Sequence, residues 1–387
     1  MQNFLMFFTT FFIQLIIAVE MNLVAPLAPY LSDYFGINPS SVILFNIGFS
    51  IVGLLVPILG AFADKYGKKK SIMISLLFFI IGTIISGLAK IPIVFALGRI
   101  FIGIGYFALS GINLSYLSEF IPYESRGKAS GILRLAFGIA ILGSPIYATS
   151  LITKYDHLLS IYLPLTIIGI ITLVLMTILP ETEKNPEIKM ETKELISVIK
   201  KPINFKALLI AFLFLVAPIF LMNFLGIYIS SIFSLDQLKI GYIYTIVALG
   251  TMFGIIFAGL FIDKIGKEKL AKISYSLVFI SLVGLFISKS LYFMIISLIL
   301  MTFGLDSGWT AYQTLLSEIE PSKRGIFMSL LYTVNAIAVT IFSILGPVFY
   351  NIGGYKLLII LSIITNFAAL MIFYNISFEE IINAQQV

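Results

Sequence analysis

The sequence predicts an all-α membrane protein whose twelve transmembrane helices form two pseudo-symmetric six-helix bundles. Three observations support this fold class. The 387-residue chain is 59% hydrophobic and only 11% charged, whereas soluble domains carry about 25% charged residues. Twelve mostly apolar segments each reach the roughly 20 residues that a bilayer-crossing helix needs. A charged stretch between two such segments, residues 60–70, returns in similar form at residues 259–269.

The apolar segments follow one another closely, apart from one longer polar stretch. Residues 181–206 carry eleven charged side chains. This stretch divides the chain into an N-terminal bundle (1–180), a cytoplasmic linker (181–205) and a C-terminal bundle (206–387). Apolar residues at 195–199 predict either a short amphipathic helix on the inner membrane face or a solvated connection. Hydropathy places the twelve segments at 4–31, 40–63, 71–89, 91–118, 128–152, 157–179, 206–233, 239–262, 270–288, 290–317, 325–350 and 354–376.

Basic residues gather in the loops on one side of these segments. The loops after the even-numbered segments hold 18 of the 25 Lys and Arg residues, the opposite loops hold five, and two lie inside segments. Cytoplasmic loops carry the excess of Lys and Arg. We therefore expect a multi-pass protein of the cell membrane with this side, and both termini, in the cytoplasm.

The repeated charged stretch reads G-A-F-A-D-K-Y-G-K-K-K in its first copy and G-L-F-I-D-K-I-G-K-E-K in its second, with seven of eleven positions identical. A Ser-Glu-x-x-Pro sequence and an Arg-Gly pair also recur, after the fourth segment in the first half and after the tenth segment in the second half. This pattern resembles the signature loop of the major facilitator superfamily of secondary transporters. The residues that carry the resemblance are Gly60, Asp64, Gly67, Lys68, Glu119 and Arg126, with Gly259, Asp263, Gly266, Lys267, Glu318 and Arg324 as their counterparts.

The resemblance implies that the loop charges act in gating. Asp64, Lys68 and Glu119 would form a charge relay that latches one half against the other on the cytoplasmic side, with a counterpart in the second copy. The alternative is a topology signal whose charges are only solvated. Glycines at positions 67 and 266 predict tight turns, since glycine tolerates positive φ, and those at 60 and 259 predict close helix approaches.

Four charged residues lie well inside the predicted segments, away from the segment ends: Glu20, Arg99, Arg134 and Asp306. Ionisable residues in a membrane are costly and are functional candidates by default. Helix rise places Glu20 and Arg99 at similar depths, so the two side chains can pair. We expect Glu20 to take and release a proton while Arg99 sets its affinity; a permanent structural ion pair is the alternative.

Further candidates lie on the fourth, seventh and tenth segments. Arg99 and Asn113 share one helical face, and the surrounding sequence resembles the signature of sugar porters and metabolite–proton symporters. In those transporters a tryptophan of the tenth segment lines the sugar site, which implies a pocket role for Trp309, beside Asp306 and Gln313. We also expect Asn223 to face the cavity; contact with another helix is the alternative. Arg134 either faces an anionic substrate or Asp306, or extends to the cytoplasm.

The residue inventory excludes several other functions. The chain has no cysteine and one histidine, which argues against disulfides, thiolate metal sites and histidine-rich metal centres. No G-x-x-x-x-G-K-[ST] sequence is present, so ATP-driven transport has no support, and we expect no cofactor. Because the positive charges follow the loops rather than one face, nucleic acid is not an expected partner.

These observations predict a monomeric secondary transporter that moves a small organic solute by alternating access. Its expected partners are the solute, protons and the lipid bilayer. Proton-coupled uptake of a sugar or organic acid competes with proton-driven efflux of amphipathic drugs or metabolites. A transporter-fold sensor or a membrane enzyme would be a different class of function. We expect no enzymatic activity, and we expect the ionised groups to lie in a water-filled central cavity.

Overall fold

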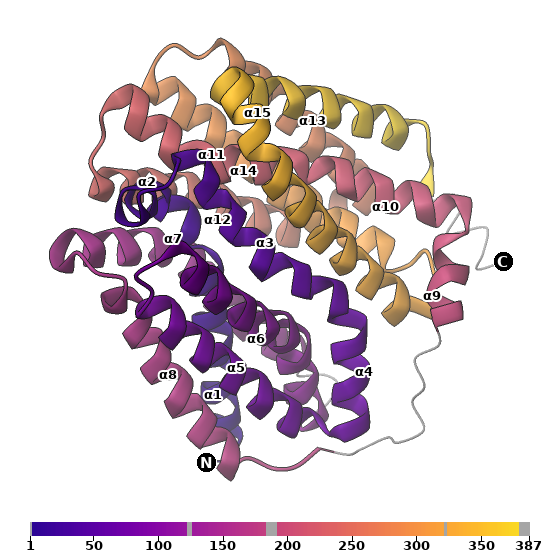
Figure 1. The fold of residues 1–387 in the computed structure, drawn as a ribbon. Coiled ribbons are helices and arrows are strands. Elements are labelled where there is room, and N and C mark those ends of the chain that lie inside the picture. Colours follow the sequence, from indigo (N-terminus) through magenta and orange to yellow (C-terminus); the bar gives the residue numbers. More distant parts are fainter. Residues whose placement is uncertain (1, 122–125, 183–191, 321–322, 379–387) are drawn as a thin grey trace. The chain divides into compact units, whose positions relative to one another are not determined.

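The computed structural model describes the whole chain except residues 1, 122–125, 183–191, 321–322 and 379–387 (Figure 1). The described residues form α-helices and short 3-10 helices, without a strand. The chain divides into two compact units. The first comprises Met1–Met190 with Asp236–Gly241, and the second comprises Glu191–Leu235 with Tyr242–Val387. Each unit is described by itself below.

The first unit contains eight α-helices, coloured indigo to magenta in Figure 1. They are α1 (Gln2–Met21), α2 (Val24–Phe35), α3 (Phe45–Ser50), α4 (Val56–Tyr66), α5 (Lys68–Gly87), α6 (Pro92–Glu119), α7 (Arg126–Tyr155) and α8 (Leu159–Ile178), with the 3-10 helices η1 (Pro39–Leu44) and η2 (Ile51–Leu55) on either side of α3.

The first two predicted spans are broken rather than continuous. Residues 4–31 were expected as one helix, but α1 ends at Met21 and α2 begins at Val24. Pro26 explains the break, because it has no N–H to bond the Asn22 carbonyl and its ring crowds that carbonyl. The second span alternates between α and 3-10 geometry from η1 to α4.

Helices α5 and α6 pack most closely in this unit, and small residues make this possible. A Cβ added at Gly82 would lie 2.6 Å from the backbone nitrogen of Ile102, and one at Gly105 would lie 2.7 Å from the Cβ of Phe79. Neither position has room for a side chain. The seam therefore fixes α6 against α5 along several turns.

The second unit contains the remaining seven α-helices, except that the first residues of α12, up to Gly241, belong to the first unit. They are α9 (Thr192–Ile199), α10 (Pro202–Phe214), α11 (Val216–Phe233), α12 (Gln237–Ile265), α13 (Lys267–Ile287), α14 (Leu291–Leu316) and α15 (Arg324–Tyr374). Helix α9 lies in the predicted linker and belongs to this unit. The break at Leu215 between α10 and α11 precedes Pro218, which cannot bond the Phe214 carbonyl.

The structure accounts for twelve spans. Among the described residues, ten helices are long and apolar enough to cross a membrane, and Val24–Leu55, bent by 117°, supplies an eleventh candidate. Helix α15 contains two helices divided at Gly354, whose φ of 61° and ψ of −162° are not helical. The division falls at the first residue of the twelfth predicted segment.

The two units repeat the same helix pairings. In the first unit α5 packs along α6 and α8, and α1 packs along α7. In the second unit α13 packs along α14 and along α15, and α11 packs along α15. In the first unit these pairs join span 3 to span 4, span 3 to span 6, and span 1 to span 5. In the second unit they join the corresponding spans: 9 to 10, 9 to 12, and 7 to 11. The repeat seen in the loops therefore extends to the packing of the helices.

Candidate functional site

An ion pair between Glu20 and Arg99 lies inside the first unit. Glu20 occupies the last turn of α1, and Arg99 projects from the early part of α6; one guanidinium nitrogen donates to the Glu20 carboxylate. The side chains are 0% and 1% exposed, respectively. The predicted pairing is therefore present, but in this structure neither group lines an open water-filled cavity. Exchange of a proton with solvent requires another conformation.

An aromatic ring covers the guanidinium. Phe49, at the end of α3, places its ring centroid 4.6 Å from the central carbon of the Arg99 guanidinium, which is cation–π distance. Gly103 makes this approach possible, because a Cβ there would collide with the Phe49 backbone. The sequence analysis missed Phe49. The sequence indicated it only indirectly, through a glycine one helical turn after the arginine, which leaves room for another residue to approach.

The pair leaves polar atoms unused. Glu20 Oε2 and Arg99 Nε are buried and have no hydrogen-bond partner in the described part of the chain. The hydroxyl of Tyr162, on α8, is buried, and the Arg99 guanidinium lies close enough to interact with it. It lies within electrostatic reach of both charged groups. This tyrosine was not among the predicted site residues.

The residues on the face of α6 that carries Arg99 range from buried to exposed. Asn113 is buried, and its amide donates to the Thr10 carbonyl of α1 at 2.8 Å. Tyr106 is half-buried, with its hydroxyl 2.7 Å from the Met21 sulfur. Ser110 is exposed. The contact of Asn113 is the one expected of a residue that packs two helices together.

In the second unit, Asp306 has a hydroxyl partner. Thr251 Oγ1, on α12, donates to Asp306 Oδ2, on α14, at 2.7 Å. Trp309 follows on α14 and is half-buried. Gln313 donates to the Tyr332 hydroxyl of α15 at 2.8 Å. Asp306 and Gln313 therefore have separate partners on different helices.

Two further candidates have different surroundings. Asn223 is half-buried on α11, and Arg134 is exposed on α7. Neither residue is brought to the Glu20–Arg99 pair by any described contact.

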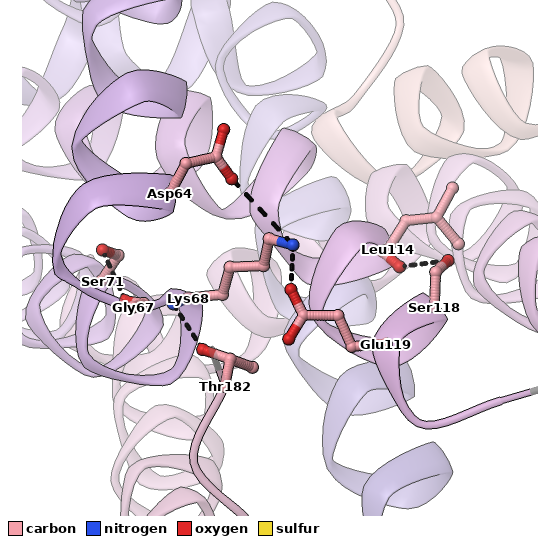
Figure 2. A network of polar contacts seen from close by, with 8 residues as sticks. All are labelled: Asp64, Gly67, Lys68, Ser71, Leu114, Ser118, Glu119 and Thr182. Atoms are coloured by element: carbon pink, nitrogen blue, oxygen red, sulfur yellow. Dashed lines mark hydrogen bonds and ion pairs between the residues drawn. The ribbon is translucent and has the colours of Figure 1, made fainter. Parts of the chain in front are cut away.

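The first signature loop forms a charged cluster (Figure 2). Lys68 pairs with Glu119, at the end of α6, and lies 4.0 Å from Asp64 on α4. The Lys68 and Glu119 side chains are 15% and 27% exposed. Gly67 permits the turn between α4 and α5 with φ 97° and ψ 135°, a region that side chains rarely enter. The cluster joins three helices of one unit.

The residue after Lys68 performs a task that the sequence analysis missed. Lys69 Nζ donates to the carbonyls of Thr177 (3.0 Å) and Leu179 (2.7 Å) and lies 3.2 Å from a carboxylate oxygen of Glu181. It thus satisfies carbonyls at the end of α8. Thr182 Oγ1 in turn accepts from the backbone N–H of Lys68 at 2.8 Å (Figure 2). These contacts fasten the end of α8 to the start of α5.

The second signature loop keeps one ion pair of the pattern. Lys267 pairs with Glu318 at 2.5 Å, whereas the exposed Asp263 has no ion pair within the described residues. Gly266 repeats the positive φ of the first copy, at 93°. Arg324 donates through Nε to the Ser317 carbonyl at 2.7 Å. Both loops therefore hold charges within their own unit.

Glycine 259 does not perform the predicted role. We expected it to allow a close helix approach, but a Cβ there would meet no described atom within 4 Å. The close contacts of α12 occur earlier in the helix, where Gly250 and Gly254 meet the backbone of α14. The surroundings of Gly60 and the side chain of Arg126 lie outside the described part of the structure.

In the second unit the end of α15 is bonded by a lysine that does not match Lys69 in the repeat. Lys272 Nζ donates to the Ile376 carbonyl, just beyond α15, at 3.1 Å. It also pairs with Glu268 at 2.5 Å. Glu268 occupies the position that matches Lys69 in the repeat. In the second unit the lysine that contacts a helix end therefore lies one helical turn later in the sequence than Lys69 does in the first unit.

The linker helix is anchored by a separate buried acid. Glu320 accepts from Lys201 at 2.6 and 2.8 Å and from the Asn204 amide at 2.9 Å. Asn204 also donates to the Val198 carbonyl of α9 at 2.9 Å. Burial alone would raise the pKa of Glu320, but the hydrogen bonds from Lys201 and Asn204 outweigh it and hold that pKa below its ordinary value. Among the described residues, no group of three or more His, Cys, Asp or Glu side chains is placed to hold a metal ion.

The comparisons with known proteins agree with this architecture. A model of the Major Facilitator Superfamily matches residues 10–236 and 207–381. The chain is 27% identical over 349 residues to the uncharacterized MFS-type transporter YwfA of Bacillus subtilis (strain 168), covering 86% of this chain and 83% of YwfA. It is 27% identical over 325 residues to the sialic acid transporter NanX of Escherichia coli (strain K12), covering 81% and 78%.

The fold is also found among solved structures. The crystal structure of a D-xylose-proton symporter matches with a TM-score of 0.74 at 16% identity, covering 96% of this chain and 97% of that one. At this identity the likeness concerns the fold alone. The family match, by contrast, extends over nearly the whole chain and includes both halves. The chain therefore belongs to the Major Facilitator Superfamily, a family of membrane transporters rather than enzymes.

Proposed function

We propose that the protein is a proton-coupled secondary transporter that takes up a small organic solute by alternating access. The observation that supports this proposal best is the buried Glu20–Arg99 pair. A charged side chain in the middle of a membrane costs at least about 2.5–3.5 kcal/mol on insertion scales. Two opposite charges held together reduce this cost, and a proton that neutralises Glu20 would release Arg99.

The release of Arg99 gives a route from proton binding to conformational change. The pair joins α1 to α6, so protonation weakens a contact between two spans of the first unit. In this proposal the pair is closed in one state and opens when a proton binds. Binding of solute near the midplane between repeats, followed by rocking of one half against the other, is the general behaviour of such transporters.

For the solute, we propose a sugar or a small organic acid. Sialic acid transport is named for one relative and D-xylose–proton symport for one structural neighbour. Asp306, Trp309 and Gln313 are the proposed pocket residues of the second unit, with Asn223 and Arg134 as further candidates. We place the protein in the cell membrane, as a monomer with cytoplasmic termini. Proton-driven efflux is the alternative direction.

The test uses purified protein in liposomes that contain a pH-sensitive dye. D-xylose and sialic acid are added outside in separate trials, without an imposed pH gradient. Entry of the added solute together with protons acidifies the lumen, whereas entry in exchange for protons, the reaction of a proton-driven exporter running in reverse, makes the lumen alkaline. Glu20→Gln should abolish the proton movement. Asp33→Asn, an exposed carboxylate of the same unit, should retain it. Proton movement that persists in Glu20→Gln would refute the assignment of Glu20.

A further inference from the structure

Asp306 is an acid without a basic partner in the described part of the second unit. It lies near the middle of α14, a helix that contains no Lys or Arg. The two basic residues of α12, Lys239 and Lys264, lie about 18 and 20 Å along that helix from Thr251, the residue that contacts Asp306. Glu20, by contrast, is balanced by Arg99. An ionisable group within a membrane is costly and marks a functional site by default.

The neighbouring helix holds the Asp306 carboxylate in place. A threonine within a helix commonly donates to the carbonyl four residues earlier, which for Thr251 is that of Val247. Thr302 of α14 already donates to this carbonyl at 3.0 Å, and Thr251 donates to Asp306 Oδ2 at 2.7 Å instead. The hydroxyl thus positions the carboxylate but does not balance its charge.

The other carboxylate oxygen is open to a ligand. Asp306 Oδ1 has no hydrogen-bond partner in the described part of the chain, yet it is not one of the buried polar atoms that lack a partner. It is therefore accessible. The same face of α14 stays accessible for two further turns through Trp309, Thr310, Gln313 and Thr314, all half-buried, whereas the residues between these pairs are buried. Together with Asp306, these four residues form the α14 strip.

The chemistry of the α14 strip differs along its length. A carboxylate only accepts hydrogen bonds, so the Asp306 end suits a cation and repels the carboxylate of an organic acid. Trp309 follows one turn later, and an indole face also attracts cations. Gln313 lies about 10 Å from Asp306 along the helix, and its amide and the two threonine hydroxyls can bond the hydroxyls of a solute.

A metal ion fits the α14 strip poorly. Divalent ions such as Ca²⁺ take six or more oxygen ligands. Among the described residues, no three His, Cys, Asp or Glu side chains come together to hold a metal. An ammonium group needs fewer partners, because each of its N–H groups is satisfied by one acceptor.

We propose that Asp306 binds the protonated amine of a hydroxylated solute, so that the substrate class is an amino sugar or a similar amino alcohol rather than an organic acid. The ammonium pairs with Asp306 Oδ1 and lies against Trp309, while the solute hydroxyls bond Gln313 and the threonines. The inference rests on the proposed function, which takes these residues as the pocket, and narrows its solute. The solute then supplies the counter-ion that the described part of the unit lacks.

The test uses Trp309 as its reporter, because it is the single tryptophan of the chain and lies one helical turn from Asp306. Its fluorescence is followed while purified protein in detergent is titrated with D-glucosamine at about pH 7, below the ordinary amine pKa of about 7.7 or more. N-acetyl-D-glucosamine is the matched probe, since it keeps the ring but has no charge. Glucosamine should change the emission saturably, and the acetylated sugar should bind at least about tenfold more weakly, the loss expected for a charge-assisted hydrogen bond.

The variant Asp306→Asn keeps the size of the side chain and removes its charge. Its affinity for glucosamine should fall at least about tenfold, whereas Asp33→Asn, which changes an exposed carboxylate of the first unit, should bind as the wild type does. Thermal unfolding separates binding from a structural role. Removal of an unbalanced charge should leave the Tm of Asp306→Asn unchanged or raise it, and a Tm well below that of the wild type would count against the proposal.

Three results overturn the amine assignment: equal binding of both sugars, no saturable change with glucosamine, or an unchanged affinity in Asp306→Asn. A change in emission when sodium chloride replaces potassium chloride, absent from Asp306→Asn, would assign the site to an inorganic cation and overturn it as well. The proposed function is tested separately, by the proton movement that depends on Glu20, so the two proposals can fail independently.

Discussion

Replacement of Lys69 by methionine should destabilise the first unit measurably. The last four carbonyls of a helix have no partner within the helix, and Lys69 satisfies the carbonyls of Thr177 and Leu179. A hydrogen bond from a charged group contributes about 1.5–3 kcal/mol net. The pair with Glu181, which is 69% exposed, adds little, because exposed ion pairs contribute at most about 1 kcal/mol.

The expected loss follows from these two bonds. Together they contribute about 3–6 kcal/mol, and we take the lower limit because interfacial water can reach part of the freed carbonyls and methionine avoids the cost of burying an ammonium. For a unit of this size, about 3 kcal/mol corresponds to a decrease in Tm of roughly 6–12 °C. The assay is thermal unfolding of the purified protein in detergent, with all variants heated at one rate.

Lys70→Met provides the matched control. Lys70 is the next residue on α5 and is exposed, so its replacement should change Tm by no more than a degree or two. A Lys69→Met variant that unfolds at the temperature of the Lys70 variant would show that the cap of α8 is energetically irrelevant. A Glu181→Gln variant, which removes only the ion pair, should resemble the control.

Two further changes have outcomes that the structure determines. Gly67→Ala should lower stability by about 1–3 kcal/mol, because alanine is strained at its positive φ; Gly138→Ala, in an open helical position of α7, is the control in the same melting assay. The depressed pKa of Glu320 means that its contacts with Lys201 and Asn204 stabilise the fold above the ordinary carboxyl pKa of roughly 4.3 and are lost as the pH falls through the lower folded value. The difference in Tm between wild type and Glu320→Gln should therefore stay constant from pH 7 to about pH 5 and shrink as the pH is lowered further to about pH 3; a difference that stays constant down to pH 3 would contradict this account.

Hydropathy and the internal repeat were sufficient to predict the fold. Membrane helices must satisfy their backbone internally, so a long apolar segment leaves few alternatives. The interruptions were not predicted, although Pro26 and Pro218 supplied a signal. A proline in a helix weakens the bond to the carbonyl four residues earlier, and both breaks occur next to that position. The helix-pairing repeat could not be derived, since the loop motifs carry no information on which faces meet.

The site could be predicted only in part. Charge within an apolar segment identified Glu20 and Arg99, and helix rise brought them to similar depth. Phe49 and Tyr162 escaped notice because aromatic residues are frequent throughout the chain, 14% of all positions, and sequence does not show which rings lie beside a charge. Lys69 was grouped with its basic neighbours, because a run of lysines does not show which of them is buried.

The displaced cations of Lys69 and Lys272 have a consequence for any study that treats the halves as equivalent. When the two halves are aligned by their repeat, Lys69 is matched with Glu268. The lysine that bonds the corresponding helix end in the second half is Lys272. An ancestral half-protein reconstructed by averaging such columns would mix opposite charges at one site and lose the fastening altogether. Duplicated genes can thus conserve a contact while exchanging the amino acids that make it, and only coordinates reveal the exchange.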